Sequence, residues 1–440
     1  MRTAGLSFKI LCCSCLIAIS LDGTTSAIGQ TRSVKRSPPL TTADPQRAGV
    51  SPERLARIDT MLQDAVKSGG IPGVVALVAR NGKIVFNKAY GMADNAAGRP
   101  LKTDDIFRIA SQSKAITATA AMILWEEGKF QLDDPISKYI PEFKNPQVLK
   151  TYIEADGTWT GEPAKREITI RDLLTHTSGL GYGDIDGDPR FQKLYKKAGI
   201  AIAFCSDPLT IGENVRRLAK MPLHHNPGER FTYAMGLDVV GYLIEVLSGM
   251  PFDQFLQKRL FDPLGMKDTG FYLSSQKAGR LVAVQRPENG KWVHFPITFY
   301  DPDYPIKGAK ALFSGGGGLC STAKDYATFL QMHLNGGELN GVRILSRTTE
   351  EMMRSQQVPS ELFGGANAYF SLAFSTVTEK GQAHGGNGSA GTFSWGGYFN
   401  TQYFADPKEN LIGILMKQTQ GGNDETGWKF PLLVGQCVDD

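Results

Sequence analysis

The stretch "DDIFRIASQSKAITATAAMILWEEGKF", residues 104–130, contains the tetrapeptide Ser111-Gln112-Ser113-Lys114 at the start of a long apolar segment. An apolar segment of this length predicts a buried helix. Residues three positions apart share one face of a helix, so the Lys114 amine can reach the Ser111 hydroxyl and take its proton. The pattern therefore makes Ser111 a candidate nucleophile and Lys114 its candidate base.

The S-x-x-K spacing occurs twice more, so the spacing alone does not identify a site. The stretch 274–277 is polar and has no apolar helix behind it. The stretch 321–324 opens a second helical segment, where Ser321 is expected to be the N-cap. A capping role is also a complete alternative for Ser111. Other motifs must decide between the two explanations.

The first 27 residues are expected to be a secretory signal. Arg2 and Lys9 precede the apolar run "ILCCSCLIAIS", and small residues at 25–27 suit a cleavage site. The run is too short to span a bilayer, and no later stretch qualifies. We therefore expect an exported protein, periplasmic or extracellular, with no stable membrane span; an uncleaved anchor is the alternative. Residues 28–48 are expected to be a flexible lead-in.

Three cysteines follow the predicted signal: Cys205, Cys320 and Cys437. They allow at most one disulfide, and their pairing stays open. These three cysteines form no C-x-x-C motif, and the sequence has no H-E-x-x-H motif, so neither a metal nor another cofactor is predicted. The formal net charge of +4 over 440 residues is too small to indicate nucleic acid as a partner.

The N-terminal half predicts strands followed by helices. Residues 51–69 have the pattern of an amphipathic helix that begins at Ser51-Pro52. The apolar segments 74–79 and 83–91 are joined by Asn81-Gly82, a strong hairpin signal. From the S-x-x-K helix onwards the pattern is mostly helical.

Strand character returns after the Gly-rich turn at 314–322. Residues 368–377, 392–406 and 410–418 are separated by turn residues, as in an antiparallel meander. The sequence therefore predicts an α/β (α+β) fold with an antiparallel sheet built from both chain termini, flanked by helices, and with an inserted helical region. The expected parts of one catalytic domain, residues 49–440, are 49–112 with 285–440 for the α/β part and 113–284 for the helical part.

Tyr233, in "NPGERFTYAMGLDVVGYLIEVLSG", is a candidate proton relay for Ser111. A phenol near cationic groups can lie close to its ionised state, which suits proton transfer. The alternative is an ordinary half-buried aromatic residue just before an apolar helix.

Four blocks of the sequence, taken together, resemble the serine β-lactamase and penicillin-binding-protein-like hydrolases, and within them the class C-like carboxylesterases (family VIII esterases). The blocks are "FRIASQSKAITATAAMILWEEGKFQLDDPISKYIPEF", "ITIRDLLTHTSGL", "PGERFTYAMGLDVVGYLIEVLSG" and "SGGGGLCSTAKDYATFLQMHLNGG". The resemblance covers residues 50–420, and implies a β-lactamase/DD-peptidase-like fold. It also implies Ser111 as nucleophile, Lys114 as base and Tyr233 as relay.

The sequence departs from the β-lactamase pattern at two motifs. Tyr233-Ala234-Met235 lacks the asparagine of Tyr-x-Asn, and there is no Lys-Thr-Gly. The stretch 67–69, Lys-Ser-Gly, precedes the nucleophile and so has the wrong order. The stretch 398–400, Tyr-Phe-Asn, is expected inside a late strand. We interpret both as coincidences.

By resemblance, Trp395-Gly396-Gly397 fills the triad position just before a strand, and His384-Gly385-Gly386 is the alternative. A tryptophan there removes the cation that β-lactamases use to hold a substrate carboxylate, so neutral acyl substrates are expected. The glycine pair lets backbone approach the substrate. The N–H of Tyr398 or its neighbour would join that of Ser111 as an oxyanion hole.

These motifs predict an exported serine hydrolase that cleaves small-molecule esters or amides through an acyl-enzyme on Ser111. The alternatives are a β-lactamase or D-Ala-D-Ala carboxypeptidase/D-aminopeptidase, and a non-catalytic penicillin-binding-like sensor or binding module. No G-x-S-x-G occurs, so an α/β-hydrolase is not indicated. As base, Lys114 would have to be neutral, and whether Lys114 or Tyr233 is the base stays open. His176 is expected to be a structural loop residue. The natural substrate and the oligomeric state stay open.

Overall fold

The computed structural model describes residues 1, 31–363, 365–385 and 388–440. The predicted signal at 1–27 lies, apart from Met1, outside the described residues, so its cleavage stays a prediction. The predicted lead-in pairs with the folded body from residue 31 onwards: β1 (Thr31–Arg32) pairs with β13 (Val342–Arg343), and β2 (Thr41–Thr42) runs parallel to β4 (Lys83–Asp94). No helix in the described ranges has the length and apolar character needed to cross a membrane.

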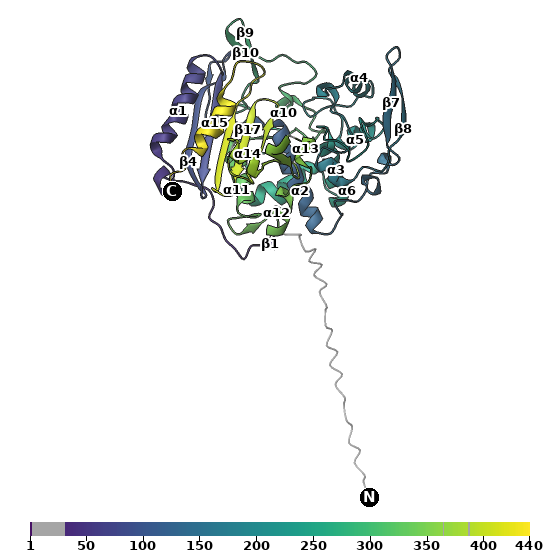
Figure 1. The fold of residues 1–440 in the computed structure, drawn as a ribbon, viewed down its shortest axis with the longest axis horizontal. Coiled ribbons are helices and arrows are strands. Elements are labelled where there is room, and N and C mark those ends of the chain that lie inside the picture. The colour runs from purple at the N-terminus through teal and green to yellow at the C-terminus, as the bar shows by residue number, and fades with distance from the viewer. Residues whose placement is uncertain (2–30, 364, 386–387) are drawn as a thin grey trace.

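The main sheet has nine strands and draws on both ends of the chain, which confirms the predicted fold class (Figure 1). Its order is β14-β15-β16-β17-β18-β3-β4-β2, and β5 also pairs with β4. All neighbours are antiparallel except β2 and β4. The remaining strands of this sheet are β3 (Gly73–Arg80), β5 (Arg99–Pro100), β14 (Ala368–Phe370), β15 (Ser375–Val377), β16 (Phe393–Gly397), β17 (Thr401–Asp406) and β18 (Leu411–Met416).

Strand β3 separates two hydrophobic cores because its side chains alternate between the faces of the sheet. Val74, Ala76 and Val78 pack into a smaller core with residues of helices α1 (Pro52–Lys67) and α15 (Thr426–Gly435). Their neighbours Val75, Leu77 and Ala79 belong to the large core that extends into the helical region. A strand buried on both faces is continuously apolar, as "VVALVA" is.

The helical region lies at the side of the molecule opposite α1 and α15 (Figure 1). Its centre is α2 (Ser113–Glu126) against α6 (Gly236–Ser248). The other helices are α3 (Ile170–Leu174), α4 (Pro189–Lys197), α5 (Ile211–Leu218), α7 (Phe252–Leu256), α8 (Asp262–Leu264), α9 (Ser275–Ala278), α10 (Tyr304–Lys307), α11 (Ala323–Leu334), α12 (Arg347–Arg354), α13 (Ser360–Phe363) and α14 (Glu379–Ala383).

Several short strands lie outside the main sheet. The hairpin β7–β8 projects from the helical region and has no counterpart in the sequence expectations. These short strands are β6 (Phe107–Arg108), β7 (Gln147–Ile153), β8 (Thr158–Pro163), β9 (Gln285–Glu288), β10 (Lys291–His294), β11 (Cys320–Ser321) and β12 (Glu338–Leu339).

Two of the three predicted C-terminal strands are hairpins. The stretch 368–377 forms β14 and β15, and 392–406 forms β16 and β17. The prediction that 398–400 lies inside a strand is therefore wrong: these residues form the turn, with Asn400 in the left-handed region at φ 69. Asparagine adopts that conformation more readily than most residues. Trp395-Gly396-Gly397 ends strand β16, and the strand that follows it, β17, begins after this turn.

Candidate active site

Ser111 lies in a tight turn that leads directly into helix α2. A 3-10 turn, η2 (Ala110–Gln112), precedes Ser113, so the S-x-x-K motif crosses from this turn into the helix. The preceding Ala110 is fully buried and has a positive φ of 45, which is costly for a residue with a Cβ. Strained backbone of this kind is concentrated at functional sites, where the surrounding structure fixes it. Ser111 itself is half-buried.

Lys114 is buried and has an acceptor for each of its three ammonium protons. Its Nζ lies 2.6 Å from the Gly316 carbonyl oxygen, 2.9 Å from the Tyr182 hydroxyl and 3.2 Å from Ser111 Oγ. Burial by itself lowers the pKa of Lys114, but the Tyr182 and Tyr233 phenols outweigh burial and raise it above the ordinary lysine value. A lysine that acts as a base must be neutral, which requires a lowered pKa, whereas the pKa of Lys114 is raised.

Tyr233 lies on the other side of the serine hydroxyl. Its hydroxyl donates to Ser111 Oγ over 2.6 Å, and the Trp395 Nε1–H reaches the same hydroxyl at 3.4 Å. The Tyr233 ring stacks on that of Tyr182, with centroids 5.2 Å apart, and Lys114 Nζ lies 4.6 Å from the Tyr233 centroid. The structure therefore brings two of the predicted groups, the Lys114 ammonium and the Tyr233 hydroxyl, within hydrogen-bond distance of Ser111 Oγ.

Strand β16 brings the tripeptide Trp395-Gly396-Gly397 to the nucleophile. A Cβ on Gly397 would lie 2.5 Å from the Ile109 carbonyl oxygen, so the strand backbone touches the segment that leads to Ser111. Tyr398 follows in the turn, where its carbonyl accepts a hydrogen bond from Gln420 Nε2 at 2.5 Å. Trp395, rather than a charged residue, therefore occupies the end of the strand beside Tyr233.

The alternative triad position lies elsewhere. His384 and Gly385 follow helix α14 and are exposed, and His384 Nδ1 lies 3.1 Å from Asn367 Oδ1. Gly386 lies outside the described residues. Of these two candidates, Trp395 contacts Tyr233, whereas His384 contacts Asn367.

Aromatic rings extend from the site in two directions. Trp395 adjoins Phe370 and Phe363, with centroids 5.4 and 6.3 Å away. Tyr398 adjoins Phe204 at 5.9 Å and the partly exposed Phe299 at 6.4 Å. The surface next to Ser111 is therefore apolar along β16 and the turn that follows it.

His176 is a buried wall of the site. Its ring packs against Tyr233 with centroids 4.5 Å apart, and its Nδ1 accepts a hydrogen bond from the Ala234 N–H at 3.2 Å. Burial, followed by the charge of Lys114, lowers the pKa of His176 well below its ordinary value, so the imidazole is neutral. The hydrogen bond from the Ala234 N–H to His176 Nδ1 fixes the backbone at Tyr233 and Ala234. This is a structural role of the kind predicted for His176.

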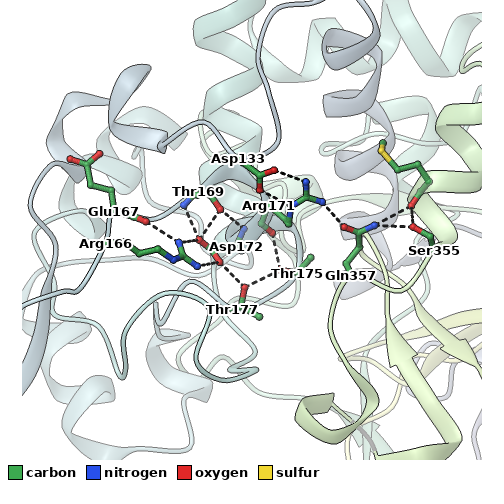
Figure 2. A network of polar contacts seen from close by, with 11 residues as sticks. Asp133, Arg166, Glu167, Thr169, Arg171, Asp172, Thr175, Thr177, Ser355 and Gln357 are labelled. Atoms are coloured by element: carbon green, nitrogen blue, oxygen red, sulfur yellow. Dashed lines mark hydrogen bonds and ion pairs between the residues drawn. The ribbon is translucent and has the colours of Figure 1, made fainter.

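A polar network holds the loop that carries His176 (Figure 2). Asp172, near the start of α3, accepts from both Arg166 nitrogens at 2.6 and 2.9 Å and from Thr177 Oγ1 at 2.9 Å. Arg171 bridges Asp133 and Gln357, which links α3 to the C-terminal region. Because Thr177 is the next residue after His176, this network fixes the imidazole against Tyr233.

The two other S-x-x-K matches are structural. Ser274 is the exposed residue before α9, and Lys277 forms an ion pair with Asp268 at 3.2 Å. The expected helix N-cap at Ser321 is wrong by one residue: Thr322 accepts the hydrogen bond from the Asp325 N–H at 3.1 Å. Ser321 belongs to β11, whose pairing with β6 fixes it before the helix begins.

Three contributors to the site escaped sequence reasoning: Tyr182, the Gly316 carbonyl and Asp238. Tyr182 follows "HTSGLG" in a loop, and Gly316 lies within the Gly-rich turn, so neither lies on a helix or strand with a readable period. The four blocks of the resemblance include Gly316 and Asp238, but the second block ends at Leu180, two residues before Tyr182. A backbone carbonyl, moreover, leaves no residue-type signal. Asp238 lies in the first turn of the apolar helix α6 and is buried. A charged residue within an otherwise apolar helical segment is a signal that could have identified it from the sequence.

Metal ligation is not evident in the described part of the chain, where no group of three His, Cys, Asp or Glu side chains is placed to hold an ion. Cys205, Cys320 and Cys437 are free thiols.

The Beta-lactamase family profile matches residues 58–435 of this chain. The chain is 35% identical over 370 residues to an uncharacterised protein of Mycobacterium tuberculosis, covering 81% of this chain and 88% of that protein. It is 33% identical over 385 residues to Esterase EstB of Burkholderia gladioli, covering 83% and 90%. Among solved structures, EstCE1, a hydrolase with promiscuous acyltransferase activity, has a TM-score of 0.74 at 28% identity and covers 88% of this chain and 98% of that one.

Proposed function

This chain belongs to the beta-lactamase family and is a serine hydrolase, and from that premise we propose that it is a carboxylesterase whose acyl-enzyme forms on Ser111. The observation that carries the proposal is the position of Ser111 Oγ between Lys114 Nζ at 3.2 Å and the Tyr233 hydroxyl at 2.6 Å. The Tyr233 hydroxyl donates to Ser111 Oγ in the structure, and once this phenol has lost its proton it becomes the acceptor that an activated serine needs.

Lys114 and Tyr233 act as one unit that gives up one proton. The remaining proton stays on Lys114, because three acceptors surround its Nζ and its pKa is raised. Tyr233 is then the base: it takes the Ser111 proton as Oγ attacks the ester carbonyl. The Lys114 ammonium stabilises the phenolate that this role requires.

The oxyanion of the tetrahedral intermediate is held by backbone N–H groups of Ser111 and of Tyr398 or its neighbour. Ile109 is right-handed (φ −85, ψ −6) and Ala110 has φ 45. This order of conformations turns successive N–H groups toward one concavity that binds anions. The close approach of Gly397 to Ile109 brings the second donor strand to the same place.

Collapse of the intermediate breaks the ester C–O bond, and the leaving alcohol takes its proton from Tyr233. In the second half-reaction the Lys114–Tyr233 pair removes a proton from water, whose oxygen attacks the acyl carbon. The Ser111 Oγ–acyl bond then breaks, the acid leaves and Ser111 regains its proton.

Neutral esters with apolar acyl groups fit the surroundings of Ser111. The end of β16 presents Trp395 beside the Tyr233 hydroxyl, and aromatic residues continue on either side of it. A substrate carboxylate would find an indole N–H there in place of a cation, which is a weaker partner. The esterase name of the Burkholderia gladioli relative supports the same substrate class.

The test compares S111A with S274A, the matched serine of an unrelated S-x-x-K stretch. S111A should lose hydrolysis of p-nitrophenyl butyrate and covalent labelling by a fluorophosphonate, whereas S274A should keep both. Esterase activity retained by S111A would refute the assignment. Faster turnover of nitrocefin or of a D-Ala-D-Ala peptide would instead assign a β-lactamase or peptidase, and no hydrolysis or labelling of any kind would indicate a binding module.

Export and domain extent complete the proposal. The basic and apolar N-terminal pattern supports removal of residues 1–27, which would leave Ile28 as the first residue of the mature protein. Residues 49–440 would then act as one catalytic domain. N-terminal sequencing of the protein from the periplasm or the medium tests the first point, and an N-terminus at Met1 would contradict it.

A further inference from the structure

Asp238 is a buried carboxylate directly under the Gly-rich turn 314–318. It lies in the first turn of α6 and is 3% exposed. Its Oδ1 accepts a hydrogen bond from Ser314 Oγ and a longer one from the Gly316 N–H at 3.3 Å. A Cβ on Gly316 would lie 2.4 Å from Asp238 Oδ2, so the turn backbone is pressed against the carboxylate.

The same turn also binds helix α2 on its other side. Thr117 Oγ1 donates to the Gly315 carbonyl at 2.8 Å, and the Leu319 N–H donates to Ser113 Oγ at 3.1 Å. Between these two contacts the Gly316 carbonyl accepts the 2.6 Å hydrogen bond from Lys114 Nζ. The Gly316 carbonyl is therefore the one acceptor around Lys114 Nζ that belongs to the backbone of the turn. Contacts with both α2 and α6 fix the position of that turn.

Charge connects the two buried residues as well. Burial raises the pKa of Asp238, while the Ser314 hydroxyl and the positive charge of Lys114 favour the ionised form. Three titratable groups interact electrostatically with Lys114. Tyr182 comes from the loop before η5 (Gly183–Ile185), Tyr233 from the segment before α6, and Asp238 from α6 itself. His176, neutral, completes the surroundings. A buried ammonium is stabilised by a nearby carboxylate, so Asp238 adds to the effect of the two phenols on Lys114.

We infer that Asp238 is a positioning residue for the nucleophile: through Ser314 and Gly316 it fixes the carbonyl that orients the Lys114 ammonium against Ser111, and its carboxylate contributes to the electrostatic stabilisation of that ammonium. The inference rests on the proposed role of Ser111 and Lys114. Asp238 does not touch the substrate, so it acts only through Lys114.

The experiment compares D238N, D238A and S314A with D325N, a control at another mostly buried carboxylate whose pKa is also raised by burial. Asparagine keeps an acceptor for the turn but removes the charge, whereas alanine removes both. For p-nitrophenyl butyrate we expect kcat to fall about tenfold in D238N and about 100-fold in D238A, with little change in KM, since displacing a catalytic group by 1 Å can cost about 100-fold. S314A should lie between D238N and wild type.

The pH profile supplies a readout that a purely structural role would not change. Without the carboxylate, the alkaline limb of kcat/KM should move to lower pH by about half a unit or more in D238N, because a nearby opposite charge favours the charged form of an amine. D325N should keep the wild-type profile. If folded D238N and S314A retain the wild-type kcat and the same alkaline limb, the inference is wrong.

Failure of the proposed function would be visible separately. If S111A hydrolyses the ester as fast as wild type, both the function and this inference are overturned. If S111A is inactive but D238N behaves like D325N, only the role of Asp238 is overturned. Circular dichroism and fluorophosphonate titration give the folded and reactive fraction of each variant, so that a loss of folded protein is not counted as a loss of kcat.

Discussion

The Tyr233 hydroxyl lies 2.6 Å from Ser111 Oγ, although the two residues are 122 positions apart in the sequence. One residue belongs to the turn before α2 and the other to the segment before α6, so the contact exists only when these two helices pack together. The surroundings of the proposed nucleophile are therefore formed by the packing of the helical region and not by a single motif.

We predict that Y233F loses esterase activity while staying folded. The variant removes only the hydroxyl that receives the Ser111 proton, so kcat should fall about 100- to 10,000-fold, the range of general acid–base catalysis. Stopped-flow or steady-state hydrolysis of p-nitrophenyl butyrate measures this. Y139F is the control, because its hydroxyl contacts Asp134 at 2.6 Å on the surface. Equal activity of Y233F and Y139F would exclude Tyr233 as the base.

The alkaline limb of the pH–rate profile should depend on Tyr182. The phenol of Tyr182 is the first contributor that raises the pKa of Lys114 against the effect of burial. In Y182F this support is reduced, so the pKa of Lys114 falls and the ammonium is lost at lower pH than in wild type. The rate should therefore decline at lower pH in Y182F. An unchanged alkaline limb would show that Tyr182 does not control the charge of Lys114.

His176 should make the protein less stable in mild acid. Its pKa is lowered by burial, so below about pH 6.5 the unfolded chain binds a proton that the folded protein does not. The free energy of unfolding then falls as pH falls, by up to about 1.4 kcal/mol per pH unit from this residue. Urea denaturation of wild type and H176Q at a series of pH values tests this by comparing slopes. Parallel slopes would contradict the prediction.

Gly397 and Gly396 should respond differently to alanine. A Cβ on Gly397 would lie 2.2 Å from Thr401 Oγ1 and 2.5 Å from the Ile109 carbonyl oxygen, whereas the nearest atom to one on Gly396 is the Thr401 carbonyl oxygen at 3.4 Å. G397A should lower stability by about 1–3 kcal/mol, as overpacking does, and should reduce kcat by displacing Ser111. G396A is the matched control and should change the melting temperature little. If G397A and G396A were equally stable and equally active, the close approach of Gly397 to Ile109 would be contradicted.

Trp395 should control which esters are accepted. W395A removes the ring beside Tyr233 and its N–H contact, whereas W395F keeps a smaller aromatic surface and loses the N–H. We expect kcat/KM for apolar esters to fall about tenfold in W395A, in line with the loss of one aromatic contact, and less in W395F. The same measurement with acetate and decanoate esters checks the cause. A loss that is independent of acyl length would point to Tyr233 positioning alone.

Local patterns predicted part of the site well. The Ser111–Lys114 contact follows from helical spacing, and the β3–β4 hairpin from Asn81-Gly82. Tyr182 and Gly316 reach Lys114 from 68 and 202 positions away, and both lie in loops whose path depends on tertiary packing. The same limit explains the missed β16–β17 turn, because Tyr398 and Phe399 have strong strand propensity and only the pairing register reveals the turn.

The pairing of β3 with β18 has a consequence for biosynthesis. Arg80, at the end of β3, bonds with Glu409, just before β18, across 329 positions. A ribosome that has synthesised the S-x-x-K helix has already made β4 on one side of β3. It has not yet made β18 on the other side, or β16, which carries Trp395. The sheet must close late and over a long sequence separation, which slows folding and leaves apolar strands transiently open to aggregation. Such delayed closure would leave the incomplete sheet dependent on chaperones until its last strands emerge.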